Sequence, residues 1–500
     1  MYKRQLFDRF RRQPTPSPQP RRLATRRYDG AAGGRLFADW RAGSNSADTE
    51  IQNSLTTLRD RSRDLARNDQ YFRRYLSLMQ TNVVGERGVN LQVKALNDDG
   101  SLDSFANDLI EREWSDWCKA GSCTSDGRLN FSDVQRLFVQ SLLRDGEVLV
   151  RYQVGENKSK FALEFIDPDF LDENYTKELQ NGNVVRMGVE LAKRTRRPVA
   201  YYLLQKHPGD VNFATIPKDY QVVKVRDMLH IYVQDRPGQT RGVPSNTSIM
   251  TALRHLHSHR EAELIAARVG ASKIGFFTSR TGDEFPADEL DGLEMPLIDA
   301  QPGTFHQLPS GVDFTTFDVD HPSTAFADFE RSVLRSIASG LNISYNSLAN
   351  DLTSVNYSSI RAGTLEDREA YKVQQRFMIA HLVEPVYQTW LARLFDSPDF
   401  PLPASRLPKF ANASFFRPKG FQWVDPMKEI GAAVIGLQNG IMSLQDVASN
   451  YGRDVEETMS QIARDKDIAE QYGITLAFEP LGSAHAPITP LGVEEDEDDS

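Results

Sequence analysis

AFADFERSVLRSIASGLNIS (325–344), NSLANDLTSVN (346–356) and YSSIRAGTLEDREAYKVQQRFMIAHLVEPVYQTW (357–390) are three successive segments that together decide the fold. In the first, Phe326, Phe329, Val333 and Ile337 recur at helical spacing. The second is too rich in Asn and Ser to continue a helix. The third is a long charged helix with Pro385 near its end, where a kink or break is expected. Two helices joined by a flexible polar loop are typical of a movable structural element. They are not typical of an active site, because the segment cannot assemble a nucleophile, a base and an orienting group.

A second long helix is predicted before this stretch, in SNTSIMTALRHLHSHREAELIAARVGA (245–271). Ser245 is expected to open it, and its apolar residues Ile249, Leu253, Leu256 and Leu264 form only a narrow stripe. About 25 residues make a rod of about 40 Å at 1.5 Å per residue. A long helix with so thin an apolar face is expected to pack on neighbouring copies of the chain. Residues 275–323 are rich in Pro, Gly, Phe and Asp and predict a small excursion of strands and loops.

The first half of the chain predicts a sheet decorated by helices. A helical pattern covers residues 49–84, and a second helix begins with a capping box at Ser132 and Gln135 and ends at Asp145-Gly146. Strands are predicted at EVLVRYQV (147–154), FALEFI (161–166), VVRMGVELA (184–192), VAYYLL (199–204) and MLHIYV (228–233). Their spacing favours a mainly antiparallel sheet, so the fold class is α+β.

The composition is that of a water-soluble globular protein of several domains. The 500 residues are too many for one core and indicate two to four domains or subdomains, with 40% hydrophobic and 26% charged residues. No apolar run approaches the ~18 residues of a membrane span, so no membrane association is expected.

The start of the chain, MYKRQLFDRFRRQ, has no apolar stretch like that of a signal peptide. Cys118 and Cys123 lack further ligands nearby and are expected to be free thiols in a reducing compartment.

Charge is distributed unevenly around a net value of −10. Residues 1–35 carry ten Lys and Arg, whereas the chain ends in GVEEDEDDS (492–500). Such blocks are usually solvated tails, although a basic tail could also touch DNA phosphate or another acidic surface. An acidic body argues against tight, non-specific binding of DNA, because neutralisation of phosphate dominates that affinity.

Two residue groups are candidates for a catalytic centre. His255 and His259 share a helix face at i, i+4 and could chelate a metal, but no Glu lies between them as in HExxH. Asp167 and Asp169 in FIDPDF could suggest a glycosidase or a two-metal nuclease, yet Asp before Pro is a common turn former. The sequence has no GxSxG, no Walker loop and no GxGxxG after a strand. No catalytic residue, metal or cofactor is therefore expected, and a metal-dependent hydrolase or nuclease around His255 and His259 is the alternative.

The block DRPGQTRGVP (235–244) forms a turn between the last predicted strand and the long helix. Arg236 and Arg241 flank this turn, well placed for bidentate contacts with carboxylates across a boundary between subunits. The alternative is that both are solvated loop arginines.

Five blocks carry a resemblance to a known family: RNDQYFRRYLSLMQTNVVGERG (67–88), LLRDGEVLVRY (142–152), RRPVAYYLL (196–204), HIYVQDRPGQTRGVP (230–244) and GLNISYNSLANDLTSVNYSSIRAG (340–363). In content and order they resemble the lambda-type family of tailed-phage portal proteins, over roughly residues 35–470. The resemblance implies a portal fold with a mixed α/β wing, long stem helices, a small clip and a helical C-terminal crown.

The resemblance also implies the parts of the chain and their boundaries. These are a flexible basic arm (1–48), the wing (49–244), stem helix 1 (245–272), the clip (273–323), stem helix 2 (324–341), a tunnel loop (342–356), a long wing helix and return (357–425), the crown (426–482) and an acidic tail (483–500). The tunnel-loop residues expected to face DNA are Asn346, Ser347, Asn350, Asp351, Thr353, Ser354 and Asn356. The expected ring-interface residues are Arg236, Arg241, Leu253, Leu256, Phe329 and Val333.

The implied function is a non-enzymatic ring, a dodecamer, at one vertex of the capsid in the virion. Double-stranded DNA would pass through it during packaging and ejection. Its implied partners are the terminase large subunit, the major capsid protein or a scaffold, and a head-tail connector protein, with assembly in the host cytoplasm. A capsid or connector protein of another type is a further alternative.

Overall fold

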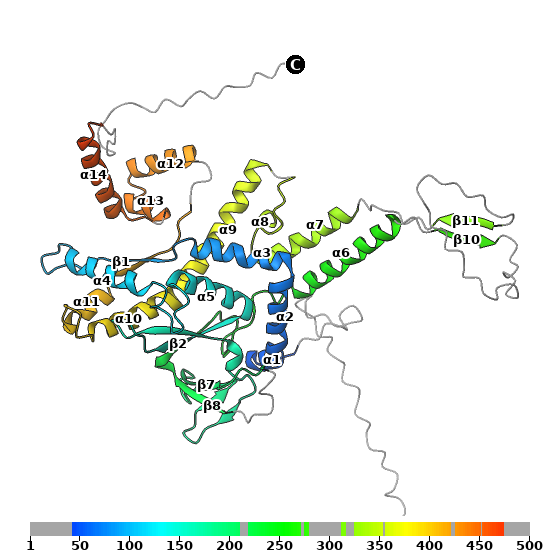
Figure 1. Ribbon diagram of the computed structural model, residues 1–500, viewed down its shortest axis with the longest axis horizontal. Helices are drawn as coiled ribbons and strands as arrows, with labels where there is room; N and C mark the ends of the chain where they lie inside the picture. Colours follow the sequence, from blue (N-terminus) through cyan, green and yellow to red (C-terminus); the bar gives the residue numbers. More distant parts are fainter. Residues whose placement is uncertain are drawn as a thin grey trace, which may run out of the picture.

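The structure is a computed structural model that describes residues 43–210, 219–271, 275–279, 312–316, 325–353, 356–421, 426–451 and 453–474. A mixed body of helices and sheets carries a two-helix rod on one side and a C-terminal group of helices above it (Figure 1). The basic arm as far as residue 42, most of the predicted clip and the acidic tail lie outside the described residues.

The described residues of the body form the α-helices α1 (Ala47–Gln52), α2 (Leu55–Asn68), α3 (Gln70–Met79), α4 (Ser104–Trp117) and α5 (Phe131–Asp145), which precede the rod, and α10 (Glu384–Phe395) and α11 (Leu407–Ala411), which follow it. The rod consists of α6 (Met250–Ala271) and α7 (Ala325–Gly340), followed by α8 (Tyr345–Ala349) and α9 (Tyr357–Met378). The C-terminal unit contains α12 (Pro426–Gln438), α13 (Leu444–Asn450) and α14 (Val455–Gln471). The described chain also contains the π-helical turns η4 (Gln80–Val84) and η9 (Ile379–Val383) and the 3-10 turns η5 (Pro168–Phe170), η7 (Val225–Asp227) and η10 (Ala404–Arg406).

Every ladder between the described strands is antiparallel, as the strand spacing predicts. In the first sheet β2 (Glu147–Gln153) lies between β3 (Ala162–Ile166) and β9 (Met228–Tyr232). The second sheet has the order β4 (Lys177–Glu178), β5 (Val184–Arg186), β6 (Val189–Leu191), β7 (Pro198–Leu204) and β8 (Tyr220–Lys224). The remaining pairs are β1 (Asn90–Val93) with β12 (Ser414–Arg417) and β10 (Gly275–Ser279) with β11 (Val312–Thr316).

The structure corrects three local predictions. Residues 184–192 form two strands rather than one, because Met187 and Gly188 take positive φ values of 47° and 81° and turn the chain. Helix α5 is capped by Asn130, whose side chain accepts from the Asp133 amide, so the capping box at Ser132 is wrong. Helix α6 begins at Met250, after several turn residues, rather than at Ser245.

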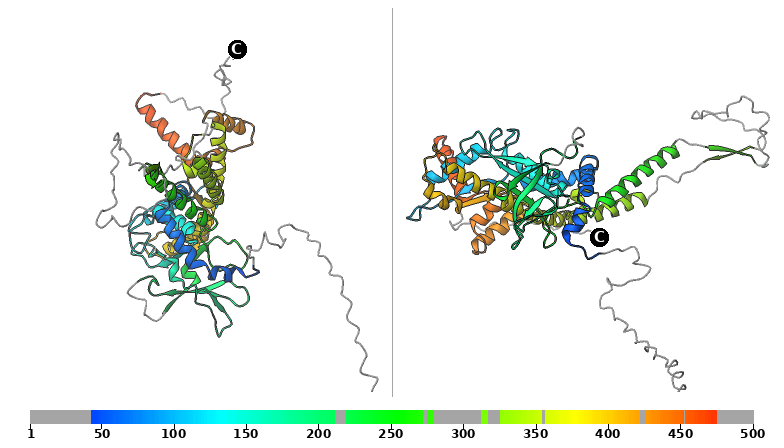
Figure 2. Two further views of the ribbon diagram at one scale, coloured as in Figure 1. Left: turned by 90° about the vertical axis from the view of Figure 1, so that its right-hand side faces the viewer. Right: turned by 90° about the horizontal axis from the view of Figure 1, so that it is seen from below.

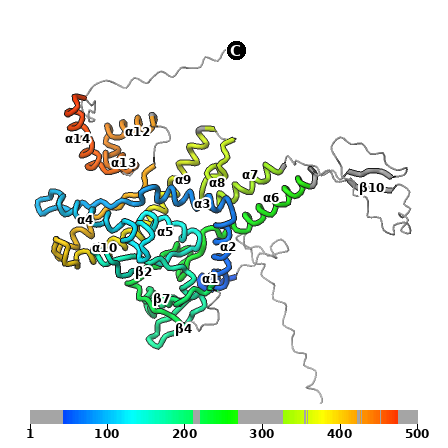
Figure 3. Tube along the Cα trace, in the orientation of Figure 1, coloured from blue at the N-terminus to red at the C-terminus, as the bar shows by residue number. Residues whose placement is uncertain are grey.

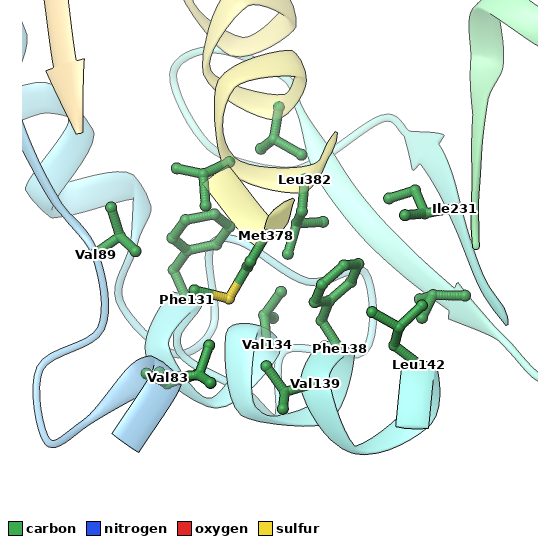
Figure 4. Close-up of a cluster of buried hydrophobic side chains, with 14 of the residues drawn as sticks. Val83, Val89, Phe131, Val134, Phe138, Val139, Leu142, Ile231, Met378 and Leu382 are labelled. Atoms are coloured by element: carbon green, nitrogen blue, oxygen red, sulfur yellow. The ribbon is translucent and has the colours of Figure 1, made fainter. Parts of the chain in front are cut away.

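Helix α5 lies at the centre of the main hydrophobic core. Its side chains Phe131, Val134 and Phe138 point towards Met378, the last residue of α9, and Leu382 in the following turn η9 (Figure 4). Phe138 and Val134 are essentially inaccessible to solvent. Segments that are distant in the sequence therefore share one core, and the long helix α9 is fixed to the body at its C-terminal end.

The interruption predicted near Pro385 is present as the π-helical turn η9, which separates α9 from α10. Proline lacks an amide hydrogen, and its ring clashes with the carbonyl of the residue four positions earlier, here His381. A wider turn removes that clash and lets the chain continue as helix. Because Val386, Tyr387 and Trp390 are buried, α10 remains anchored beyond the interruption.

Candidate functional surfaces

A buried ionic cluster joins the first sheet to the loop that leads into the rod. Glu147, at the start of β2, is fully buried and accepts from Arg241 Nε at 2.9 Å, Arg59 Nη2 at 2.8 Å and His230 Nε2 at 2.8 Å. Burial alone would raise the pKa of Glu147, but the Arg241 charge and the hydrogen bonds from His230 and Arg241 hold that pKa well below its usual range. Glu147 is therefore an ionised anchor at neutral pH.

Arg241 is completely buried in this cluster. Besides Glu147, its guanidinium donates to the carbonyls of Leu171 and Met187, at 2.8 Å and 2.9 Å. Its predicted place at a ring interface is therefore wrong, since its donors are used inside its own chain. Arg236 differs, because it is half exposed and pairs at the surface with Glu50 at 2.6 Å. The sequence could not show which of these two arginines is buried and which is exposed. That difference depends on which carboxylate the fold brings close to each of them.

Asp167 and Asp169 form the turn that the sequence predicts. The Asp167 side chain accepts from the Asp169 amide, and Pro168 opens the 3-10 turn η5. Arg63 donates to Asp167 at 2.7 Å and Arg59 to Asp169 at 2.6 Å. These two guanidinium groups offset the carboxylate charge, so the pair is part of the ionic framework rather than a catalytic dyad.

The possible metal ligands do not form a site that suits a metal ion among the described residues. Within the described part of the chain, the one group of three possible ligands within 4.8 Å of one another is Asp167, Asp169 and His207. Arg59 and Arg63 already occupy these carboxylates and repel a cation, so the group does not suit a metal. His255 is exposed, and His259 contacts the Phe329 ring at 4.9 Å. The histidine pair of the hydrolase alternative thus belongs to no such group among the described residues.

The rod is made by α6 and α7, which run side by side away from the body (Figure 3 and the right-hand view of Figure 2). Near the body Leu253 and Leu256 are buried together with Leu334 and Ile337 in the main core. The prediction of Leu253 and Leu256 as ring-interface residues is therefore wrong. The periodic stripe was correctly identified, but its partner is the same chain.

Farther along the rod, large apolar side chains are left uncovered. Leu264, Ile265 and Phe329 are 62%, 53% and 51% exposed, whereas Val333 is partly buried. We call Leu264, Ile265 and Phe329 the rod patch. Exposed apolar surface on a helix pair is typical of a contact with another molecule. Phe329 and Val333 keep their place as predicted interface residues, and Leu264 and Ile265 join them.

The predicted tunnel loop contains a short helix, α8, so an unbroken loop over residues 342–356 is wrong for Tyr345–Ala349. Asn346 and Ser347 lie in this helix, and Leu348 is buried beneath it. The hydroxyls of Ser344 and Ser347 donate to Asp367 of α9, at 2.8 Å and 2.6 Å. The first half of the segment is thus fixed to α9.

The second half of the segment is more open. Asn350 and Thr353 are exposed, and Asn356 is exposed while capping α9 through the Ser359 amide. Asp351 accepts from the Thr353 amide and hydroxyl and from the Tyr345 hydroxyl at 2.8 Å. The hydrogen bonds from Thr353, followed by that from Tyr345, lower the Asp351 pKa to about 2. Ser354 lies outside the described residues.

A stiff protruding rod with uncovered apolar side chains is typical of a structural protein that assembles with other chains. No helix among the described residues is both long and apolar enough to cross a membrane. Comparison with known proteins agrees with this class. Residues 33–375 match the family model described as "Phage portal protein, lambda family", and the chain belongs to that family. Members of the family are structural components of the capsid, so the chain is not an enzyme.

The relatives span almost the whole chain. The "Probable portal protein" of Halomonas phage phiHAP-1 is 35% identical over 497 residues, covering 97% of this chain and 95% of the relative. "Portal protein B" of Escherichia phage lambda is 21% identical, covering 87% of this chain and 88% of the relative. A chain in the neck of an empty gene transfer agent particle has a TM-score of 0.43 and 14% identity, covering 84% of this chain and 98% of that one. The family assignment rests on the sequence relatives.

Proposed function

We propose that copies of this chain form a closed dodecameric ring at one capsid vertex, through which double-stranded DNA enters during packaging and leaves during ejection. The terminase large subunit docks on the ring first and a head-tail connector protein later, while the major capsid protein or a scaffold surrounds it during assembly in the host cytoplasm. Family membership supports this function. The observation that carries it is the rod patch, which the chain itself does not cover.

In this proposal the body is the wing, α6 and α7 are the stem, and β10 with β11 belongs to the clip. The C-terminal unit α12–α14 is the crown. A closed ring uses a heterologous contact, in which one surface of each copy meets a different surface of the next. The rod suits such a contact because its outer half carries apolar side chains on both helices, namely Leu264 and Ile265 on α6 and Phe329 on α7.

Ring assembly is expected to fail when a charge is placed in the rod patch. Ile265→Asp puts a carboxylate where an apolar contact between copies is proposed, and burying an unpaired charge is costly. We expect at least about a tenfold lower yield of rings, because one such charge costs more than about 1.4 kcal/mol at each contact. Native mass spectrometry measures this yield.

The matched control is Ser258→Asp, which adds the same charge to an exposed position of the same helix. Both variants are expected to keep the free energy of unfolding within about 0.5 kcal/mol of the original chain, as surface substitutions usually do. Equal ring yields for the two variants would show that the rod patch does not form the contact.

The open half of the tunnel segment is proposed to border the channel as a soft collar around DNA. Asp351→Asn keeps one oxygen to accept from Thr353, and its amide group can donate to the Tyr345 hydroxyl in place of the second carboxylate oxygen, so the segment should keep its shape. We expect normal ring yield and a change of less than about tenfold in packaged DNA, since a typical hydrogen bond contributes about 1 kcal/mol. Packaged DNA is measured by nuclease protection. A loss of about a hundredfold or more would instead indicate an essential acid or base.

A further inference from the structure

The C-terminal unit, residues 426–474, has no hydrophobic core of its own in the described residues. Its large apolar side chains are left uncovered, including Ile435, Ile441 and Tyr472, which are 59%, 79% and 77% exposed. The further uncovered ones are Ile430, Leu444, Met459, Ile468 and Ile474. Among the described hydrophobic residues of the unit, only the small Ala469 is buried. A helical unit of this size needs buried apolar surface to offset the loss of chain entropy on ordering.

Helix α12 shows this shortage most clearly. Its stretch Ile430–Leu437 reads IGAAVIGL and contains no charged or polar side chain. A helix that is apolar around its whole circumference is normally buried. Here Ile430 and Ile435 remain exposed, and at 13 residues α12 is far shorter than the about 20 residues that span a bilayer. The helix therefore needs a protein surface that the described part of its own chain does not supply.

Among the described residues, polar contacts join this unit to the body. Asp454, which caps α14, is buried and pairs with Arg417 of β12 and, at 3.1 Å, with Lys94 beside β1. The Phe421 amide donates to the Asn450 carbonyl at 3.1 Å. These contacts fix the position of the unit without covering its apolar surface.

We propose that the unit gains its hydrophobic core only from the same unit of the adjacent copy, so that ring closure and ordering of α12–α14 are one event. This inference rests on the proposed ring. In a heterologous ring each copy must offer two different surfaces. Helix α12 and the C-terminal end of α14 lie on different sides of the unit (Figures 1 and 2). Both carry uncovered apolar side chains, Ile430 and Ile435 on one side and Ile468 and Tyr472 on the other.

A second copy fits these surfaces better than DNA does. A ring brings every copy of the unit beside the next one at the same height, because each is fixed to its own body through Asp454. The uncharged stretch of α12 offers nothing to phosphate, whose recognition depends on Lys and Arg. An apolar side chain from the neighbouring unit would be covered without leaving a charge unpaired.

Hydrogen exchange of the full-length chain tests the inference. We expect the amides of residues 430–437 to exchange at least about tenfold more slowly in rings than in the unassembled Ile265→Asp chain. Exchange requires local unfolding of α12, and the free energy of this unfolding should be appreciable only when the neighbouring copy packs on the helix. Ile435→Asn should remove this protection in rings, whereas Gln438→Asn, a change at an exposed polar position of α12, should keep it.

Each outcome decides between the proposals. Protection of residues 430–437 in the unassembled chain, equal to that in rings, would overturn the inference. So would rings in which this stretch is unprotected, or in which Ile435→Asn leaves its protection unchanged, while the ring itself would stand. If native mass spectrometry finds no ring for the original chain, the proposed function fails and the inference fails with it.

Discussion

Replacing Arg241 by Met is expected to lower the free energy of unfolding by about 3–5 kcal/mol, the usual cost of removing one partner from a buried ion pair. The variant leaves Glu147 with less positive charge and leaves the carbonyls of Leu171 and Met187 without their donor. Urea unfolding of the unassembled chain, prepared in the Ile265→Asp background, measures the loss.

The matched control is Arg236→Met in the same turn, whose pair with Glu50 lies at the surface. Surface ion pairs contribute about 0–1 kcal/mol, so this change should be nearly neutral. If Arg241→Met were as mild as Arg236→Met and reduced only the ring yield, Arg241 would be an interface residue after all, contrary to the buried cluster described above.

The Arg241 cluster also predicts the direction of the acid response. Burial opposes ionisation of Glu147, but Arg241 and His230 hold its folded-state pKa well below the usual value for Glu of about 4.3. A carboxylate whose pKa is lower in the folded than in the unfolded state stabilises the fold. This stabilisation is complete above the unfolded-state pKa and is lost as the pH falls from there through the folded-state pKa. The original chain should therefore lose stability below about pH 4.3, and Arg241→Met should show a shallower decline because part of this contribution is already missing.

Gly146→Ala is the second change with a large expected effect. Gly146 ends α5 with a φ of 86°, and a Cβ there would lie 2.2 Å from the carbonyl carbon of Val243. Backbone strain and overpacking each cost about 1–3 kcal/mol, so we expect a loss of about 3 kcal/mol or more in the urea unfolding experiment. The loop from β9 to α6 crosses this point, so the orientation of the rod should also be disturbed.

Gly238→Ala separates the two causes of this loss. Gly238 has a similar φ of 83°, but a Cβ there would meet nothing within 4 Å. It should show only the backbone part, about 1–2 kcal/mol. Equal losses for Gly146→Ala and Gly238→Ala would mean that the close crossing of the two chain segments does not constrain the body.

Local features of the fold were predicted from the sequence where one residue type dictates the conformation. Gly146 ends α5, Asp167 with Pro168 makes a turn, and Pro385 interrupts the long helix. Predicted strands such as 147–154 and 228–233 match β2 and β9 closely, because apolar, β-branched and aromatic residues cluster there. Strand β8 and the β1–β12 pair were missed, since they are short and their stability comes from distant partners.

The candidate surfaces were harder to predict, because the sequence shows which face is apolar but not what covers it. Leu253 and Leu256 form the stripe that was identified, yet α7 and the body cover them. Leu264 continues the same stripe but remains exposed. It differs from Leu253 and Leu256 because it lies on the part of the rod that extends beyond the body. The burial of Arg241 follows from Glu147, which lies 94 positions earlier in the chain. Such long-range pairs leave no local pattern.

Native mass spectrometry of the unmodified full-length chain tests the central claim most directly. The account predicts a closed ring, a dodecamer, as the main species at micromolar concentration, because the described residues of the rod patch and the C-terminal unit leave apolar side chains exposed, which we propose that another copy covers. A stable monomer as the sole species would contradict the account.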